Sequence, residues 1–390
     1  MTIILAILVA FGSFFLIPPR VYANICTSDC IPLMDMTGSQ KYQNETGGLY
    51  GNYQNNPPAA HAQKLSEARS QITSRDGSGN PSSSGKIVLL TMGMSNTRRK
   101  SDAFIGQAAN DNGVSSKVVI VNGARGSVVA EKWANGENWD YVTLQLTNSG
   151  VTSAQVQAIW MLHANFAPQD GSNCTDCLAE GGEYVSTLAE HQRIIIDEIG
   201  NRFPNAKIIF FSNRTYGGYA TKDLNDEPYA YESAIAARRV ILDQINGTNA
   251  KVYYSNGPVL AWGPYLWADD GHANSEGLSW FSSDFETTDG THPIENVAGK
   301  GAEKAAAHML KFFKTNIYAA SWFTGSASPP SVTVAGKPGD ANGDGKADGL
   351  DYVIWLNNYN KTVTNGSVSG DFDGNGKVDG LDYVIWLSNY

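Results

Sequence analysis

Three residues of this sequence are of the types that together carry out nucleophilic catalysis. Ser95 follows the apolar run Lys86–Thr91, and Asp289 and His292 lie three positions apart in the stretch Asp-Gly-Thr-His-Pro. This spacing allows the carboxylate to fix the tautomer of the imidazole within one turn, while the imidazole accepts the serine proton. The set predicts acyl transfer in which Ser95 attacks, His292 is the base and Asp289 orients the base.

A serine nucleophile also needs donors for the negative oxygen that develops in the transition state, and two stretches offer them. Asn122-Gly123-Ala124-Arg125-Gly126 follows one apolar run, and Asn165 follows another. We expect a glycine amide and the Asn165 side chain to join the amide of Ser95, each donor contributing about 3 kcal/mol. Gly123 is the predicted glycine, with Gly126 as the alternative.

Each of these residues also has an ordinary structural role open to it. Ser95 is a suitable helix N-cap, Asn165 suits a turn, and His292 could lie on the surface before a proline. Their positions argue against coincidence, because each follows a strand end or precedes the last helix in one consistent order. The shared placement favours the catalytic interpretation.

The elements that must position these residues alternate between strand and helix. Five β-branched or aromatic runs predict buried parallel strands: Lys86–Thr91, Lys117–Val121, Gln155–Met161, Lys207–Ser212 and Lys251–Ser255. Three segments with apolar residues at helical spacing predict helices: Glu183–Arg202, Tyr229–Ile245 and Glu295–Phe313. Asn138–Asn148 fits either state. The alternation predicts an α/β fold with a parallel sheet between helices and an active site at the carboxyl ends of its strands.

Over roughly residues 86–316, the motifs resemble those of the SGNH (GDSL-like) hydrolase family. The first block is Gly93-Met94-Ser95-Asn96, the second contains Gly123 or Gly126, the third contains Asn165, and the fifth is Asp289-x-x-His292. The resemblance implies a flavodoxin-like three-layer sandwich and a serine esterase that needs no cofactor for catalysis.

Two positions depart from the family pattern. Met94 stands where the family usually has Asp, and Ala164-Asn165 lacks the form Gly-x-Asn-Asp. Gly-x-Ser-Asn is closer to the Gly-Gln-Ser-Asn of the sialate/acetylxylan esterase branch. That similarity implies a carbohydrate ester as the substrate, with an acetyl or similar acyl group.

The C-terminus contains a repeat that predicts two calcium sites. Gly339–Tyr359 and Gly370–Tyr390 differ at only five positions, and each contains a twelve-residue loop with oxygen ligands at the spacing of a calcium loop. The backbone carbonyls of Lys346 and Lys377 complete the two sets of side-chain ligands. Those ligands are Asp340, Asn342, Asp344 and Asp351 in the first loop, and Asp371, Asp373, Asn375 and Asp382 in the second.

The repeat resembles a dockerin over essentially all of residues 339–390. Each unit is a loop followed by an exiting helix, and its last ligand is Asp, whereas a standard EF-hand has Glu. The resemblance implies a small all-α module with two structural calcium ions and a cohesin-like scaffold as its partner. A calcium-stabilised cap without a partner is the alternative, but the near-identity of the two exposed faces favours binding.

The charge and hydrophobicity of the chain limit which other partners it can have. Residues 339–390 hold eight aspartates and three lysines, and so carry half of the net charge of −10, which argues against nucleic acid. Met1 to Pro18 is almost wholly apolar, and Val21-Tyr22-Ala23 offers a cleavage site. We expect export, with no membrane contact beyond this signal segment; an uncleaved anchor is the alternative.

Two close pairs of cysteines, Cys26/Cys30 and Cys174/Cys177, fit an oxidising compartment and suggest two local disulfides, although three connectivities are open. Residues 324–338 lack a core-forming period and have the composition of a linker. The predicted organisation is a signal peptide (1–23), an irregular lead-in packed on the main domain (24–85), a hydrolase domain (86–320), a linker (321–338) and a dockerin-like domain (339–390).

The predicted function is that of a secreted esterase for acylated carbohydrate, located outside the cell or at its surface. Trp262, Tyr265, Trp267 and Trp280 precede Asp289 and could stack on sugars, although anchoring the loop is an equally good role. Arg98, Arg125 and Arg214 could pair with an acidic sugar. The alternative function is a catalytically inactive SGNH-fold protein that binds glycans, which Met94 motivates.

Overall fold

The computed structural model describes residues 30–166, 183–222, 224–326, 338–342, 346–363 and 366–390. The segment predicted as a signal peptide lies outside the described residues, as do Asp344, Cys26, Cys174 and Cys177. Cys30 is disulfide-bonded, and its partner is outside the described part of the chain. Within the described residues, no helix is both long and apolar enough to cross a membrane.

Five parallel strands form the central sheet, in the order β4-β3-β5-β6-β7. The strands are β3 (Ile87–Gly93), β4 (Val118–Asn122), β5 (Val156–Leu162), β6 (Ile208–Phe211) and β7 (Val259–Trp262). Numbered along the sheet-forming part of the chain, this is the flavodoxin-like order 2-1-3-4-5, in which the chain reverses direction across the sheet between β3 and β5. The predicted α/β architecture is confirmed.

Every residue of β3 and β5 is buried, which explains why both strands are apolar runs without polar alternation. They pair in parallel up to Gly93↔Leu162, so the two strands end side by side. Residues that follow them therefore leave the sheet at one edge.

The fifth strand was predicted at the wrong place. Residues Ala250–Val252 form a 3-10 helix, η2, which the Asn249 side chain caps by accepting from the amide of Lys251. Tyr253 is 39% exposed, so this aromatic run is not a core strand. The strand begins seven residues later than Val252, where Val259 pairs with Ile208.

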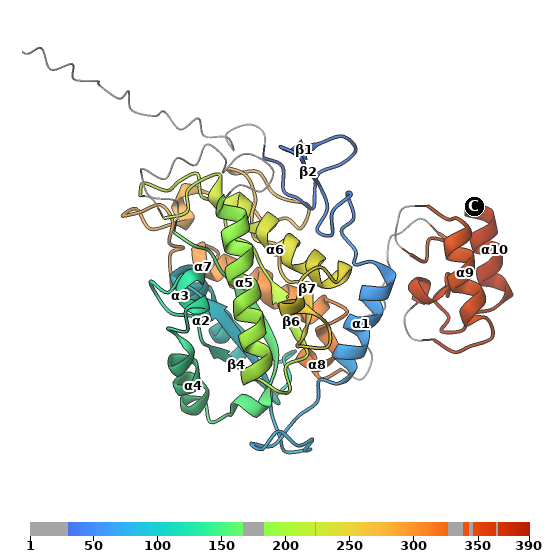
Figure 1. Cartoon of the computed structure of the whole chain (residues 1–390), viewed down its shortest axis with the longest axis horizontal. Coiled ribbons are helices and arrows are strands. Elements are labelled where there is room, and N and C mark those ends of the chain that lie inside the picture. The colour runs from blue at the N-terminus through green and yellow to red at the C-terminus, as the bar shows by residue number, and fades with distance from the viewer. Residues whose placement is uncertain (1–29, 167–182, 223, 327–337, 343–345, 364–365) are drawn as a thin grey trace, which may run out of the picture.

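Helices cover both faces of the sheet (Figure 1). On one side, α5 (Glu183–Arg202) packs against α3 (Ala130–Ala134) and α6 (Tyr229–Asn246), with α4 (Trp139–Asn148) nearby. On the other side, α2 (Ser95–Ala109) packs against α7 (Gly301–Thr315), which contacts α8 (Ala320–Thr324). The ambiguous segment is thus the helix α4. The predicted helix at Glu295–Phe313 starts later than expected, at Gly301, because residues 295–300 form the end of the loop that carries His292.

Residues before β3 pack on this domain as an irregular segment with β1 (Lys41–Tyr42), β2 (Glu45–Thr46) and α1 (Ala59–Ser70). The buried Arg238 of α6 holds the segment by donating to the carbonyl oxygens of Thr46 and Gly48 at 2.6 and 2.9 Å. Its guanidinium also pairs with Glu45 at 2.7 Å. These contacts attach the lead-in to the helical layer.

Candidate active site

The structure brings Ser95, His292 and Asp289 together as a hydrogen-bonded chain. The Nε2 atom of His292 lies 2.7 Å from the Oγ atom of Ser95. Its Nδ1 atom lies 2.9 Å from Oδ2 of Asp289. These distances are those of a nucleophile, base and orienting acid. The sequence placed Ser95 after a strand end and placed Asp289 and His292 in a loop before the last helix, and the structure brings these segments together.

Ser95 is positioned by the turn from β3 into α2. Gly93 has φ +157°, and an added Cβ would overlap the carbonyl oxygen of Leu162 and the hydroxyl of Thr97. Only glycine fits this close approach. Ser95 is then the first residue of α2, so its backbone amide has no acceptor within the helix and can donate a hydrogen bond to an anion. The serine is half-buried.

The turn that carries Asp289 and His292 is held by its own backbone. Oδ1 of Asp289 accepts from the amides of Thr291 at 2.8 Å and His292 at 2.9 Å, which leaves Oδ2 for the imidazole. Gly290 has φ +65°, and a Cβ there would overlap the carbonyl oxygen of Tyr219. The glycine between Asp289 and His292 is therefore required by backbone geometry.

The protonation states suit a general base. Burial of Asp289 opposes its ionisation, but hydrogen bonds from the amides of His292 and Thr291 and from the imidazole outweigh it, so the pKa of Asp289 is lowered. Burial lowers the pKa of His292 below its ordinary value; Asp289 opposes this shift, and the charges of Arg99 and Arg214 add to it. His292 is therefore neutral near pH 7 and can accept the proton of Ser95.

Two arginines of α2 hold the loop that carries His292. Arg99 pairs with Glu286 at 2.7 Å and with Glu295 at 3.2 Å, so its contacts lie on both sides of His292 in the sequence. Arg98 pairs with Glu295 at 3.0 Å. The ion pairs are partly exposed and each contributes little to stability. Their geometric effect is to fix the loop that carries His292 to the helix that begins with Ser95.

Arg214, which follows β6, is buried and contacts Asn96, so it is not the exposed partner of an acidic sugar that the sequence suggested. The side-chain amide of Asn96 is assigned in the orientation that gives both its nitrogen and its oxygen a partner. Its NH₂ group then donates to the carbonyl oxygen of Thr291 at 3.1 Å, and its oxygen accepts from Nη1 of Arg214 at 3.0 Å. Arg214 is 2% exposed, and burial lowers its pKa to about 10. Asn96 follows Ser95, and Thr291 precedes His292. Arg214 and Asn96 therefore link the nucleophile to the base as positioning residues.

The side-chain oxygen of Asn165 is engaged by two donors. It accepts from the amide of Glu131 at 3.0 Å and from Nδ1 of His191 at 3.1 Å. Because the oxygen is engaged by two donors, the NH₂ group must face the other way. The residue follows β5 by three positions, at the edge where Ser95 follows β3.

Gly123 does not have the free amide that was predicted for it. Its N–H donates to the carbonyl oxygen of Thr91 at 2.9 Å and so continues the hydrogen bonding between β3 and β4. The prediction of Gly123 as an oxyanion donor is therefore wrong. The alternative, Gly126, lies further along the same loop and is exposed.

The aromatic residues expected to stack on sugars are instead buried. Trp262, Tyr265, Trp267 and Trp280 are at most 5% exposed. Trp267 donates to the carboxylate of Glu227 at 2.8 Å, and Trp280 donates to the carbonyl oxygen of Leu266 at 2.7 Å. These rings anchor the loop after β7 and offer no face to a ligand.

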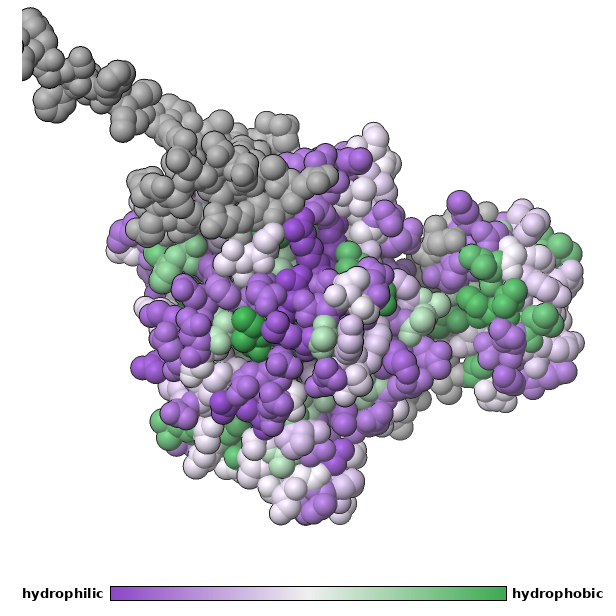
Figure 2. Space-filling view, viewed as in Figure 1, coloured by the Kyte–Doolittle hydropathy of each residue, from purple (hydrophilic) through white to green (hydrophobic). Residues whose placement is uncertain are grey.

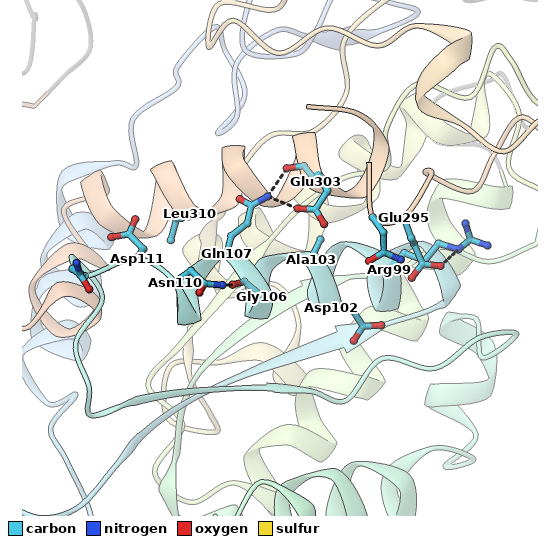
Figure 3. Close-up of a pocket in the computed structure, with 12 residues that line it drawn as sticks. Arg99, Asp102, Ala103, Gly106, Gln107, Asn110, Asp111, Glu295, Glu303 and Leu310 are labelled. Carbon is cyan, nitrogen blue, oxygen red and sulfur yellow. Dashed lines mark hydrogen bonds and ion pairs between the residues drawn. The ribbon is translucent and has the colours of Figure 1, made fainter. Parts of the chain in front are cut away.

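A polar groove of about 770 Å³ runs along the outer side of α2 and α7 (Figure 3). Gln107 of α2 donates to the carboxylate of Glu303 of α7 across it, at 2.6 Å. Ser95 and His292 are not among its lining residues, which include Arg99, Asp102, Gln107, Asn110, Glu295 and Glu303. The groove is therefore separate from the nucleophile.

The second calcium loop has the geometry of a cation site. One carboxylate oxygen from each of Asp371, Asp373 and Asp382 lies within 4.8 Å of the others. Burial raises the pKa of Asp371, and the charges of Asp382 and Asp373 raise it further. A bound calcium ion would relieve this crowding of negative charge. Asn375, whose backbone amide donates to Asp371 at 3.1 Å, lies on the same loop, and Lys377 follows.

The first loop repeats this arrangement in its described residues. Asp351 accepts through Oδ1 from the amides of Ala341 and Asn342, at 2.8 and 2.9 Å, and through Oδ2 from Asp348. Asp382 accepts in the same way from Phe372, Asp373 and Asp379. Asp351 and Asp382 are fully buried, and Asp340 is buried with 5% exposure. The equivalence supports a cation site in each loop, with Asp340, Asn342 and the Lys346 carbonyl in the first.

The two exiting helices, α9 (Gly349–Asn358) and α10 (Gly380–Asn389), pack as a symmetric pair. Trp355 donates to the carbonyl oxygen of Asp379, and Trp386 donates to that of Asp348, both at 2.9 Å. Figure 2 shows hydrophobic surface on this module. The exposed apolar side chains form two equivalent stripes: Leu350, Val353 and Leu356 on α9, and Leu381, Val384 and Leu387 on α10.

Residues 338–390 match the sequence profile of the dockerin type I domain. The C-terminal module is a dockerin type I domain. The module predicted from the repeat is thus confirmed, and calcium follows as its structural ion. None of the curated proteins matches the chain.

Solved structures similar to this chain include a lipase from a goat rumen metagenome, with 11% identity, a TM-score of 0.31 and coverage of 58% of this chain and 97% of that one. A Bacteroides fragilis protein assigned as an acylhydrolase has 11% identity and a TM-score of 0.30, and the match covers 66% of this chain and 96% of that one. An extracellular lipase from Streptomyces rimosus has 16% identity and a TM-score of 0.28, and the match covers 57% of this chain and 100% of that one. These TM-scores are low, so the assignment of a function depends on the site.

Proposed function

We propose that residues 86–320 form a serine esterase of the SGNH type, which removes acetyl or similar acyl groups from carbohydrate. The observation that carries the proposal is the hydrogen-bonded chain Ser95–His292–Asp289, with contacts of 2.7 and 2.9 Å. A second support is the order of the sequence blocks around these residues. A third support is that the proposed donors for an oxyanion, Asn165 and Gly126, follow β5 and β4, the two neighbours of β3 in the sheet.

In the acylation step, Oγ of Ser95 attacks the carbonyl carbon of the ester while Nε2 of His292 takes the hydroxyl proton. The carbonyl oxygen becomes negative in the tetrahedral intermediate. The amide of Ser95, the NH₂ group of Asn165 and the amide of Gly126 are the donors we assign to it. Asp289 stabilises the imidazolium without taking its proton.

The intermediate then collapses, and His292 gives its proton to the leaving sugar oxygen as the bond from carbon to that oxygen breaks. Water attacks the acyl-enzyme, with His292 now accepting a proton from the water. The second tetrahedral intermediate releases the carboxylic acid and restores the hydroxyl of Ser95. No cofactor takes part in either step.

The dockerin domain supports a polymeric carbohydrate as the substrate. Dockerin domains bind cohesin modules of scaffold proteins, which gather enzymes on such polymers. The equivalent stripes that begin with Leu350 and Leu381 are apolar and exposed, as a docking surface requires. Cohesin docking takes place outside the cell, so the proposal includes a secreted or cell-surface location.

The test is hydrolysis of p-nitrophenyl acetate by the folded protein and by its Ser95→Ala variant. We expect turnover in the wild type and a loss of several orders of magnitude in the variant, with unchanged thermal unfolding. Equal turnover in the two proteins would refute Ser95 as the nucleophile. Absence of turnover on acetylated sugars as well would favour a glycan-binding protein without activity.

A further inference from the structure

The loop after β4 brings Arg125 next to the nucleophile. The backbone amide of Arg125 donates to the carbonyl oxygen of Gly93 at 3.2 Å, and Gly93 lies two residues before Ser95. Arg125 also precedes Gly126, the proposed oxyanion donor. Its main chain is therefore fixed beside the turn that presents the serine.

The side chain of Arg125 is exposed and held in place by an aromatic ring. Its guanidinium carbon lies 5.3 Å from the centroid of the Tyr141 ring, which is half-buried on α4. This contact leaves the N–H groups at the edge of the guanidinium open to solvent. Among the described residues, no carboxylate lies within ion-pair distance of Arg125.

The other arginines near this edge are already engaged. Arg98 pairs with Asp102 at 2.6 Å as well as with Glu295, and Arg99 has its own pairs with two glutamates. Arg214 is buried at 2% exposure. Within the described residues, a chain with a net charge of −10 thus presents one exposed, unpaired arginine whose main chain contacts the turn that carries Ser95.

We propose that Arg125 forms an anion subsite that binds the carboxylate of a uronic acid next to the acylated sugar. The inference rests on the proposed esterase function and specifies its substrate as an acylated acidic polysaccharide. A planar guanidinium matches a carboxylate through two parallel hydrogen bonds, and the Tyr141 ring preorganises it. A neutral sugar offers no group that would use this charge.

The test is binding of trigalacturonate to the full-length protein by calorimetry, with trigalactose of the same linkage as the neutral control. Two variants are compared, Arg125→Gln and Lys117→Gln. Lys117 is exposed and precedes β4, whereas Arg125 follows it, so the control removes one positive charge at the opposite edge of the sheet. Competition of trigalacturonate with p-nitrophenyl acetate in the wild type reports whether the subsite lies at Ser95.

We expect trigalacturonate to bind more tightly than trigalactose and to compete with p-nitrophenyl acetate. Added salt should weaken its binding. Arg125→Gln raises its dissociation constant about tenfold or more, the effect of losing a charge-assisted contact, while Lys117→Gln leaves it unchanged. Equal binding of the two trimers, or full affinity in Arg125→Gln, would overturn the subsite. The binding measurement does not require turnover, so a failure of the esterase proposal is detected separately by the Ser95→Ala comparison.

Discussion

The imidazole Nε2 of His292 lies 2.7 Å from the hydroxyl oxygen of Ser95, although the two residues are 197 positions apart in sequence. Ser95 reaches this point from the end of β3, and His292 from the loop before α7. The ion pairs of Arg99 with Glu286 and Glu295 join the two elements. The contact is therefore produced by the packing of α2 and α7 and is not a local motif.

The first prediction concerns pH. Activity requires neutral His292, and burial holds the pKa of His292 below its ordinary value. The acid limb of kcat/KM is therefore expected below about pH 6.5, the value of an unperturbed histidine. Asp289→Asn should lower kcat by about 10³ to 10⁴ and move this limb to still lower pH, because Asp289 raises the pKa of His292. An acid limb that moves upward would contradict this role of Asp289.

Arg214→Gln should have the opposite effect on the pH profile. Three charges facing His292 set its pKa besides burial: Asp289 raises it, and Arg99 and Arg214 lower it. Loss of Arg214 therefore moves the acid limb of kcat/KM upward and also lowers kcat, because Asn96 loses the contact at 3.0 Å. Arg214→Lys should restore the limb but not all of kcat. A lower thermal stability with an unchanged pH profile would assign Arg214 a structural role alone.

Gly93 and Gly106 offer a matched pair of glycine substitutions. Gly93→Ala places a Cβ against Leu162 and Thr97 and should destabilise the fold by about 2 kcal/mol or more, with a large loss of turnover. Gly106 lies in the interior of α2 with open space around it, so Gly106→Ala should raise stability by about 0.5–1 kcal/mol. Denaturant unfolding with p-nitrophenyl acetate turnover checks both. Equal stability of the two variants would refute the steric requirement at Gly93.

Chelation of calcium should unfold the dockerin domain and spare the esterase. The carboxylates of Asp371, Asp373 and Asp382 lie within 4.8 Å of one another, and their repulsion destabilises the loop without a cation. NMR spectra of the full chain should lose dispersed signals from residues 339–390 on addition of EDTA and regain them with calcium. Loss of p-nitrophenyl acetate turnover while the dockerin signals persist would indicate a metal in the hydrolase domain instead.

Much of the fold was predictable because the apolar runs of the sequence coincide with the buried strands of the sheet. Four strand predictions correspond to β3, β4, β5 and β6, and α5 has the predicted bounds. The helix α2 was not predicted, because its buried face includes Asn96, Thr97, Lys100 and Ser101 as well as Phe104. A polar buried face has no hydrophobic period for a sequence pattern to detect.

The meeting of three side chains in the proposed site was predictable, and the residues that support them were less so. Ser95, Asp289 and His292 could be found because their spacing is local or follows a strand. Arg214 was expected only as a partner for an acidic sugar, because its burial and its contact with Asn96 depend on how distant loops meet. Gly123 was assigned wrongly because only the register of β3 and β4 reveals that Thr91 accepts from its amide.

The most direct test of the central claim is labelling of the folded protein with diisopropyl fluorophosphate, followed by mass spectrometry of its peptides. A serine activated by His292 should take up one equivalent, located on Ser95, and His292→Ala should abolish the labelling. Labelling of another serine, or no labelling of the folded wild type, would contradict a Ser95–His292–Asp289 esterase.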